Sequence, residues 1–334
     1  MKILLAGFGS IGRRHLNNLR ALGETDFVLL RSNRSTLPDD EIKDLPVETD
    51  IAAALAHQPQ AVVISNPTAL HLEVAIPAAR AGCSLLMEKP VSNNLERVDE
   101  FEEALQAGGG RVLVGFQFRF HPGLRQVKAW LDAGEIGAPV SCRVHWGEYL
   151  PDWHPWEDYR KGYSARSDLG GGVVHTLSHP LDYQRWFFGN AQTLWADTSS
   201  QGGLEMDVED TAEIGMRFEN GVLSSTHLDY VQRPPEHTLK IIGTQGTILW
   251  DNASGQARCY NALSGQWQES SLPSGFERNN LFLDEMRHFL DVVRGAAEPV
   301  CSLADGLAAL KLAEAVHRSA RDGQKILLNS SLEN

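Results

Sequence analysis

The sequence has few cysteines, no excess of basic residues and no long apolar run, and each shortage argues against a class of protein. The four cysteines are far apart without C-x-x-C spacing, so we expect buried reduced thiols. The chain has 43 Asp and Glu residues but only 30 Lys and Arg residues. Its formal net charge of −13 repels phosphate backbones. No apolar run approaches the roughly 18 residues of a membrane span. We therefore expect no nucleic-acid or membrane partner.

The first residues, Lys2 followed by Ile3-Leu4-Leu5-Ala6, run directly into glycines. A secretory signal needs a longer apolar region and a cleavage site, so this stretch predicts a buried strand in a cytoplasmic protein. With 334 residues, 42% of them hydrophobic, the chain is long enough for two domains with separate cores or for one large domain.

Short apolar runs alternate with amphipathic stretches in the first part of the chain. The expected strands are 2–6, 27–30, 61–65, 84–87 and 111–115, and the expected helices are 11–22, 51–57, 70–81 and 95–107. Such alternation predicts a parallel sheet between helical layers, because each crossover needs a helix to cover a sheet face.

From about residue 119 the pattern changes. A helix (122–133), a strand (139–149) and a helix-like stretch (172–188) are followed by successive strands at 193–197, 211–218, 222–229, 237–242 and 247–250, then by helices at 277–293 and 304–321. Strands in succession indicate a largely antiparallel sheet. The sequence thus predicts an α/β protein: a dinucleotide-binding domain over 1–118 and an α+β domain over 119–334 for substrate binding and oligomerisation.

Gly7-Phe8-Gly9-Ser10-Ile11-Gly12 lies between the first expected strand and the first expected helix. In this context Gly7 permits a tight turn, Gly9 lets the backbone approach a pyrophosphate, and Gly12 lets helix and strand pack closely. The backbone N–H groups at Ser10 and Ile11 open the helix, where a partial positive charge favours an anion. The motif predicts a Rossmann fold that binds a dinucleotide.

The second expected strand ends in Leu30-Arg31-Ser32-Asn33-Arg34-Ser35, without the carboxylate that NAD-specific domains place there. The guanidinium groups of Arg31 and Arg34, with the Ser32 hydroxyl, can pair with a ribose phosphate. We expect NADP to be preferred over NAD, although arginines that are merely surface charges would give the same pattern.

Three further segments resemble the Gfo/Idh/MocA oxidoreductase family. One is Ser65-Asn66-Pro67-Thr68 with His71, similar to the family loop beside the nicotinamide; a second is Glu88-Lys89-Pro90, which matches the family's EKP motif; the third is Gly170-Gly171-Gly172 followed by His179 and Asp182. The resemblance covers nearly the whole chain. It implies cofactor contacts from Asn66, Pro67, Thr68, His71, Glu88 and Lys89, and a homodimer or homotetramer formed through an open C-terminal sheet.

The resemblance also implies that Lys89 and His179 are the catalytic pair, and the chemistry of these side chains agrees. A lysine at the carboxyl end of a parallel strand faces the ligand crevice, where its ammonium group can stabilise developing negative charge. A histidine titrates near neutrality, so it can accept and return a hydroxyl proton.

The sequence departs from the family at His175, where members often carry an aspartate four residues before the histidine. If one helix carries both residues, His175 and His179 share a face and both look into the site. We expect His175 to contact substrate. An H-x-x-x-H pair is also a zinc pattern, but Thr176 stands where metalloproteases have Glu and no third ligand is obvious, so we predict no metal.

The stretch from Tyr149 to Arg166 is dense in aromatic and hydrogen-bonding side chains, which suit a sugar ring and its hydroxyls. It resembles a subgroup associated with surface-polysaccharide and modified-sugar biosynthesis. We expect Gln117 to contact the cofactor. The expected substrate contacts are Lys89, Arg119, Tyr149, Trp153, His154, Tyr163, Arg166, His175 and His179. The aromatics could instead simply fill the domain junction.

Together these features predict an NAD(P)-dependent oxidoreductase that moves a hydride to or from a carbon of a sugar, polyol or nucleotide sugar. Two alternatives use the same scaffold: a sensor or regulator that binds NADP without turnover, and an NAD-dependent glycosidase that retains its cofactor. The presence of both Lys89 and His179 argues against a sensor.

Overall fold

The computed structural model describes residues 1–32 and 40–328. It divides into two compact units. The first comprises residues 1–117, 168–170 and 277–310, and the second comprises 118–167, 171–276 and the chain from 311 onward. Within the described ranges, no helix is long and apolar enough to cross a bilayer.

The first unit is built on a parallel sheet with strand order β3-β2-β1-β4-β5-β6. Its strands are β1 (Lys2–Ala6), β2 (Asp26–Leu30), β3 (Val47–Glu48), β4 (Ala61–Ile64), β5 (Ser84–Glu88) and β6 (Val112–Gly115). The order reverses direction between β1 and β4, so the sheet has the switch point at which doubly wound folds bind ligands. The predicted Rossmann architecture is confirmed.

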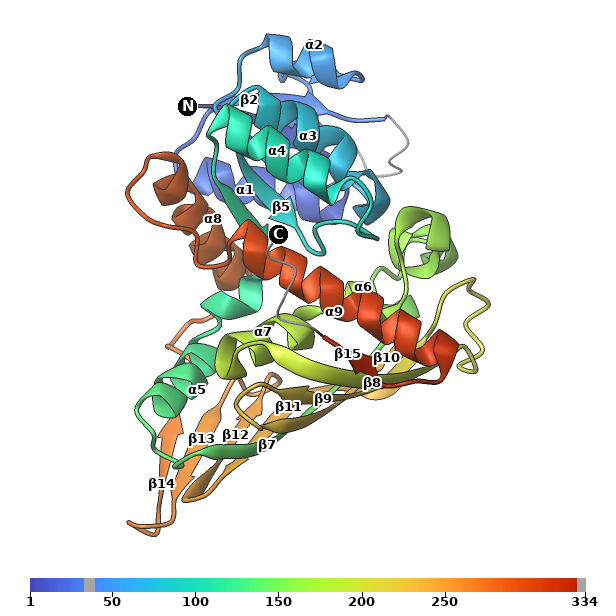
Figure 1. The fold of residues 1–334 in the computed structure, drawn as a ribbon. Coiled ribbons are helices and arrows are strands. Elements are labelled where there is room, and N and C mark those ends of the chain that lie inside the picture. Colours follow the sequence, from blue (N-terminus) through green and yellow to red (C-terminus); the bar gives the residue numbers. More distant parts are fainter. Residues whose placement is uncertain (33–39, 329–334) are drawn as a thin grey trace. The chain divides into compact units, whose positions relative to one another are not determined.

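Helices cover both faces of this sheet (Figure 1). They are α1 (Ser10–Ala21), α2 (Ile51–Ala56), α3 (His71–Arg80), α4 (Val98–Gly108) and α8 (Asn279–Val293). Helix α3 packs against α4, and α1 packs against α8, although α8 is distant in sequence. The sheet strands are almost entirely apolar and buried because both of their faces are covered.

The second unit is built on a mixed sheet with strand order β14-β13-β12-β11-β7-β10-β9-β8-β15. Its strands are β7 (Pro139–Tyr149), β8 (Ala191–Ser199), β9 (Thr211–Phe218), β10 (Leu223–Asp229), β11 (Val231–Gly243), β12 (Gly246–Asp251), β13 (Ala257–Asn261), β14 (Gln266–Ser270) and β15 (Ile326–Leu327). Strands β7 and β10 pair in parallel, whereas the other pairs are antiparallel. The predicted largely antiparallel sheet is confirmed.

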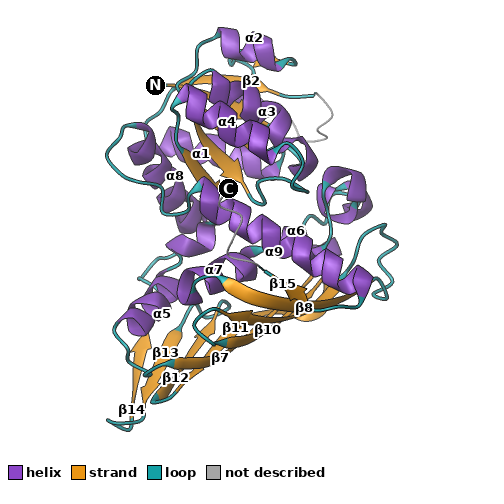
Figure 2. Cartoon of the chain, viewed as in Figure 1, coloured by secondary structure: helices purple, strands orange, loops and turns teal. Residues whose placement is uncertain are grey.

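One face of this second sheet is covered by helices and the other is open, as Figures 1 and 2 show for the described residues. The helices are α5 (Pro122–Asp132), α6 (Val173–Thr176), α7 (His179–Phe188) and the later part of α9 (Leu303–Asp322). Burial alternates along β9, where Ile214 and Met216 face the core and Glu213 and Arg217 face outward. This period of two is what a half-buried strand requires.

The prediction of one helical stretch over 172–188 is wrong. Helix α6 ends at Thr176, and α7 begins at His179. Pro180 explains the break, because it has no N–H to donate and its ring would clash with the carbonyl of Thr176 in a continuous helix. The prediction of buried reduced thiols is confirmed, since all four cysteines are free and buried.

Candidate active site

The turn between β1 and α1 contains three glycines, and what a side chain would meet differs at each of them. Gly7 has a φ of +94°, and a Cβ there would lie 2.5 Å from the backbone nitrogen of Asn66. A Cβ at Gly12 would lie 2.4 Å from the carbonyl oxygen of Gly7. At Gly9 a Cβ would meet no atom of the described residues within 4 Å. No neighbour within residues 1–32 and 40–328 requires a glycine at position 9, so the open space among them suits a ligand such as a pyrophosphate.

Helix α1 presents its N-terminus at this open space. Gly9 is the N-cap, and the first turn contains no acidic residue, so that turn itself places no carboxylate at the positive end of the helix dipole. The first backbone N–H groups of a helix have no intrahelical acceptor and can bind an anion. The predicted contacts at Ser10 and Ile11 lie in this first turn. These features fit a dinucleotide.

The predicted adenosine-side residues lie after β2. Arg31 is buried, its backbone N–H donates to the carbonyl of Glu48, and its guanidinium carbon lies 6.0 Å from the ring centroid of Phe8. Ser32 is exposed. Arg34 lies outside the described residues.

The carboxyl ends of β4 and β5 are tied together by a buried histidine. The ring of His71 lies between two carbonyl oxygens, those of Asn66 and Pro90, each 3.0 Å from a ring nitrogen. Burial lowers the pKa of His71. Pro67 and Thr68 lie in the same loop, which His71 thereby joins to the segment that carries Lys89.

Glu88 forms a buried pair with His15 of α1 beneath this loop. Its carboxylate oxygen lies 2.8 Å from Nε2 of His15, which is inaccessible to solvent. Burial opposes ionisation of Glu88, but the hydrogen bond with His15 and the positive charge of Lys89 lower its pKa below the ordinary value.

Gln117 closes the first unit, where it begins a short 3₁₀ helix and is buried. The first unit therefore holds the predicted cofactor residues that the structure describes, together with Lys89.

In the second unit, His179 is the first residue of α7 and is 2% exposed. Its ring centroid lies 4.9 Å from that of Phe118 and 5.7 Å from that of Trp146. The Trp146 ring stacks on His237 at 4.2 Å. The predicted catalytic histidine is thus held among aromatic rings rather than at a solvated surface.

A buried ion pair fixes α7 one turn beyond His179. The guanidinium group of Arg119 donates to both carboxylate oxygens of Asp182, at 2.9 and 2.7 Å, and both side chains are nearly inaccessible. Two parallel hydrogen bonds of this kind orient both partners strongly. Arg119 was expected to contact substrate, and the structure gives it this positioning contact.

His175 does not share a helix face with His179, because α6 ends between them. It is buried, and its ring packs against that of His317 in α9, with centroids 4.9 Å apart. The argument that placed both histidines on one face is therefore wrong, while the substrate contact itself stays a prediction.

The remaining predicted substrate residues lie along the loop after β7. Tyr149 lies under the guanidinium group of Arg233, at 3.9 Å. Trp153 meets the ring of Tyr230 edge-on at 5.6 Å. The loop then passes through His154, Tyr163 and Arg166, all partly buried. Trp153 thus packs within the second unit, and both the substrate contacts and the alternative that the aromatics fill the domain junction stay predictions.

Sequence reasoning missed His15 and Trp146 as neighbours of the predicted catalytic residues. A signal for His15 was available, because it follows Gly12 by three residues on the buried face of α1. Trp146 carried no such signal, since an aromatic residue in a strand usually belongs to a core.

Two family models match the chain. The model described as "Oxidoreductase family, NAD-binding Rossmann fold" covers residues 1–116, and "GFO/IDH/MocA C-terminal domain" covers residues 124–249. Among curated relatives, the myo-inositol 2-dehydrogenase of Thermotoga maritima is 26% identical over 98% of each chain.

Solved structures of the same fold include levoglucosan dehydrogenase in complex with NADH. It has a TM-score of 0.86 at 20% identity, with 98% of this chain and 99% of that chain covered. The WlbA dehydrogenase from Bordetella pertussis, in complex with NADH and UDP-GlcNAcA, has a TM-score of 0.82 at 23% identity over 98% of each chain.

Proposed function

The chain belongs to the Gfo/Idh/MocA family of oxidoreductases, and from this premise we propose that it exchanges a hydride between NAD(P) and a carbon of a sugar, polyol or nucleotide sugar. It is an NAD(P)-dependent oxidoreductase with an NAD-binding Rossmann domain. The observation that carries the assignment is the pairing of the open Gly9 turn with Lys89 directly after β5, at the carboxyl ends of one parallel sheet.

The chemistry follows from two side chains. When bound, the nicotinamide ring accepts or gives the hydride. The ammonium group of Lys89, which follows Glu88 at the end of β5, hydrogen-bonds the reacting oxygen and stabilises negative charge on it. His179 takes the hydroxyl proton during oxidation and returns it during reduction. The rings of Phe118 and Trp146 hold the imidazole of His179 in place.

NADP is the proposed cofactor of choice. Arg31 and Arg34 follow β2, and no carboxylate stands in that segment through Ser35. The double variant Arg31→Asp with Arg34→Ala should reverse the preference, measured as the ratio of Kd values for NADPH and NADH. A wild type that binds NADH more tightly than NADPH would contradict this part of the proposal.

A modified sugar or nucleotide sugar is the proposed substrate class. Support comes from the aromatic segment between Tyr149 and Arg166 and its resemblance to the polysaccharide-biosynthesis subgroup. WlbA, which shares the fold, was solved with UDP-GlcNAcA. We extend the proposal to a cytoplasmic homodimer or homotetramer that assembles through the open face of the second sheet.

The direct test is a screen of sugars, polyols and nucleotide sugars with NADP and NAD, followed by the absorbance of the reduced nicotinamide. Saturable turnover with one substrate class supports the proposal. Cofactor binding without turnover on any substrate would favour the sensor. Cofactor that stays bound through purification, together with glycoside cleavage and no net redox change, would favour the glycosidase.

A further inference from the structure

The structure surrounds His175 with groups that the sequence did not connect to it. Glu314 and His317 come from α9, and Glu209 comes from the segment just before β9. One ligand atom each from His175, Glu314 and His317 lie within 4.8 Å of one another. Only His175 of the H-x-x-x-H pattern belongs to this group, and the other two candidate ligands come from the distant helix α9.

Glu314 and His317 form an E-x-x-H pair. Residues three apart on a helix share a face, so both side chains of α9 point toward α6. The same spacing supplies carboxylate and imidazole ligands in helical metalloproteins. Two imidazoles and one carboxylate form a donor set that divalent transition metals favour.

One pair in this cluster, His175 and Glu314, is separated by more than a hydrogen-bond distance. Nε2 of His175 lies 3.9 Å from Oε1 of Glu314, which is too far for a hydrogen bond. Two ligands about 2.1 Å from a tetrahedral ion are about 3.4 Å apart, so the His175–Glu314 pair would close by about half an ångström to hold an ion.

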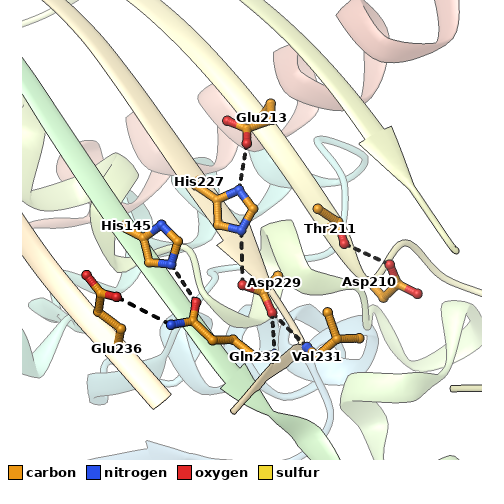
Figure 3. Close-up of polar contacts among 9 residues, drawn as sticks. All are labelled: His145, Asp210, Thr211, Glu213, His227, Asp229, Val231, Gln232 and Glu236. Carbon is orange, nitrogen blue, oxygen red and sulfur yellow. Dashed lines mark hydrogen bonds and ion pairs between the residues drawn. The ribbon is translucent and has the colours of Figure 1, made fainter. Parts of the chain in front are cut away.

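A second cluster, on the open face of the sheet, shows the contrast (Figure 3). There Nδ1 of His227 lies 2.6 Å from Glu213 and Nε2 lies 3.0 Å from Asp229. Both contacts are hydrogen-bond distances and occupy both ring nitrogens of His227. His145 stacks on this ring at 4.6 Å and contacts Gln232. Hydrogen bonds alone therefore account for the arrangement of His145, His227 and their partners on this face.

A further carboxylate, that of Glu209, holds the cluster around His175 in place. Glu209 accepts a hydrogen bond from the backbone N–H of Val174 at 3.1 Å and lies 3.4 Å from Nε2 of His317. Gly172 makes room for it, because a Cβ there would lie 2.3 Å from the carboxylate. A carboxylate that fixes a ligating histidine is a common outer partner in metal sites. With two carboxylates, a dication would be neutralised in this mostly buried place.

We propose that His175, Glu314 and His317 bind one divalent transition-metal ion of the zinc type, with Glu209 orienting His317. The ion ties α6, which leads directly into His179, to α9. This inference goes beyond the redox function and does not depend on it. It replaces the predicted absence of a metal and reassigns His175 from substrate contact to metal ligand.

The test uses full-length protein without a polyhistidine tag, stripped with a chelator and titrated with Co²⁺ and then Zn²⁺. We expect one equivalent of Co²⁺ with a visible ligand-field band that Zn²⁺ displaces. At free Zn²⁺ a hundredfold above Kd, the Tm should rise by about 5–10 °C. His317→Gln and Glu314→Gln, at partly exposed positions, should each weaken Co²⁺ binding at least about tenfold.

His145→Gln is the matched control and should bind Co²⁺ as the wild type does. Absence of stoichiometric binding overturns the proposal, as does unchanged binding in both α9 variants. Loss of binding in His145→Gln would overturn it in favour of the sheet-face cluster. Since the readouts are metal content, absorbance and Tm, failure here is distinct from failure to find an oxidoreductase substrate.

Discussion

At the scale of single residues, Glu285 of α8 is the most unusual side chain of the first unit. It is fully buried, and neither carboxylate oxygen has a hydrogen-bond partner among the described residues. Burial, and then the negative charge of Glu88, raise its pKa well above the ordinary value. A carboxyl group in this setting is held neutral and contributes unfavourably to folding once the unfolded chain can ionise it.

We predict that Glu285→Gln changes stability in a pH-dependent way. The folded pKa exceeds the unfolded value, so the wild type loses stability as pH rises above about 4.5, whereas the amide variant does not. The Tm of the variant minus that of the wild type should therefore grow between pH 5 and pH 8. Glu285→Leu should add about 1–3 kcal/mol by removing the unpaired polar atoms.

Thermal unfolding of the three proteins across this pH range checks the prediction. A difference between Gln and wild type that is the same at both ends of the range would show that Glu285 is ionised in the folded protein.

At the scale of elements, the β1–α1 turn contains one glycine that the fold requires, Gly7, and one that it does not require, Gly9. Gly7 has a positive φ and no space for a Cβ, so Gly7→Ala should destabilise the first unit by more than about 1 kcal/mol. Gly9 has space, so Gly9→Ala should fold normally. Gly9→Asp should also fold but lose dinucleotide binding, because its carboxylate would repel the pyrophosphate at the N-terminus of α1.

Unfolding curves and calorimetric titration with NADP and NAD separate these outcomes. If Gly9→Asp folded and bound the cofactor with wild-type affinity, the dinucleotide would not lie over this turn.

The β10 strand carries a second element-scale prediction. The hydrogen bond with Asp229, supported by that with Glu213, raises the pKa of His227 to about 9. Its folded pKa exceeds the unfolded value of 6.5, so the stabilisation is full below pH 6.5 and is lost as pH rises through about 9. His227→Gln should therefore lower the Tm most at pH 6 and least at pH 10.

His145→Gln serves as the comparison, because the ring of His145 contacts the side-chain amide of Gln232 rather than a carboxylate. An equal loss of Tm from His227→Gln at pH 6 and pH 10 would contradict the imidazolium assignment.

The elements also show what sequence patterns can and cannot predict. Apolar runs identified the buried parallel strands, because both faces of those strands are covered. Strand β14 was missed, since Gln266–Ser270 is an edge strand with little apolar content. The break before His179 was predictable from Pro180, but the apolar pattern on both sides outweighed it. The approach of α9 to His175 was not predictable, because no local pattern encodes contacts between distant segments.

At the scale of the whole molecule, the open face of the second sheet carries the proposed assembly. Trp195 and Leu223 are 47% and 48% exposed on it, a large apolar exposure for strand residues. We predict that Trp195→Asp and Leu223→Asp each shift the protein toward monomers in sedimentation experiments. Leu263→Asp, in the turn between β13 and β14, is the control and should leave assembly unchanged. A wild type that sediments as a monomer would contradict this prediction.

The central claim is that Lys89 and His179 perform the hydride-transfer chemistry, and turnover of Lys89→Ala tests it most directly. With a substrate from the screen, kcat should fall at least about 100-fold, the usual lower scale for lost acid–base catalysis. The Kd for the cofactor should change little, because the ammonium group acts on the substrate oxygen. His179→Ala should likewise lower kcat and leave the Kd for the cofactor nearly unchanged. Near-normal kcat in Lys89→Ala, with the fold intact, would show that the lysine is structural and would contradict the account.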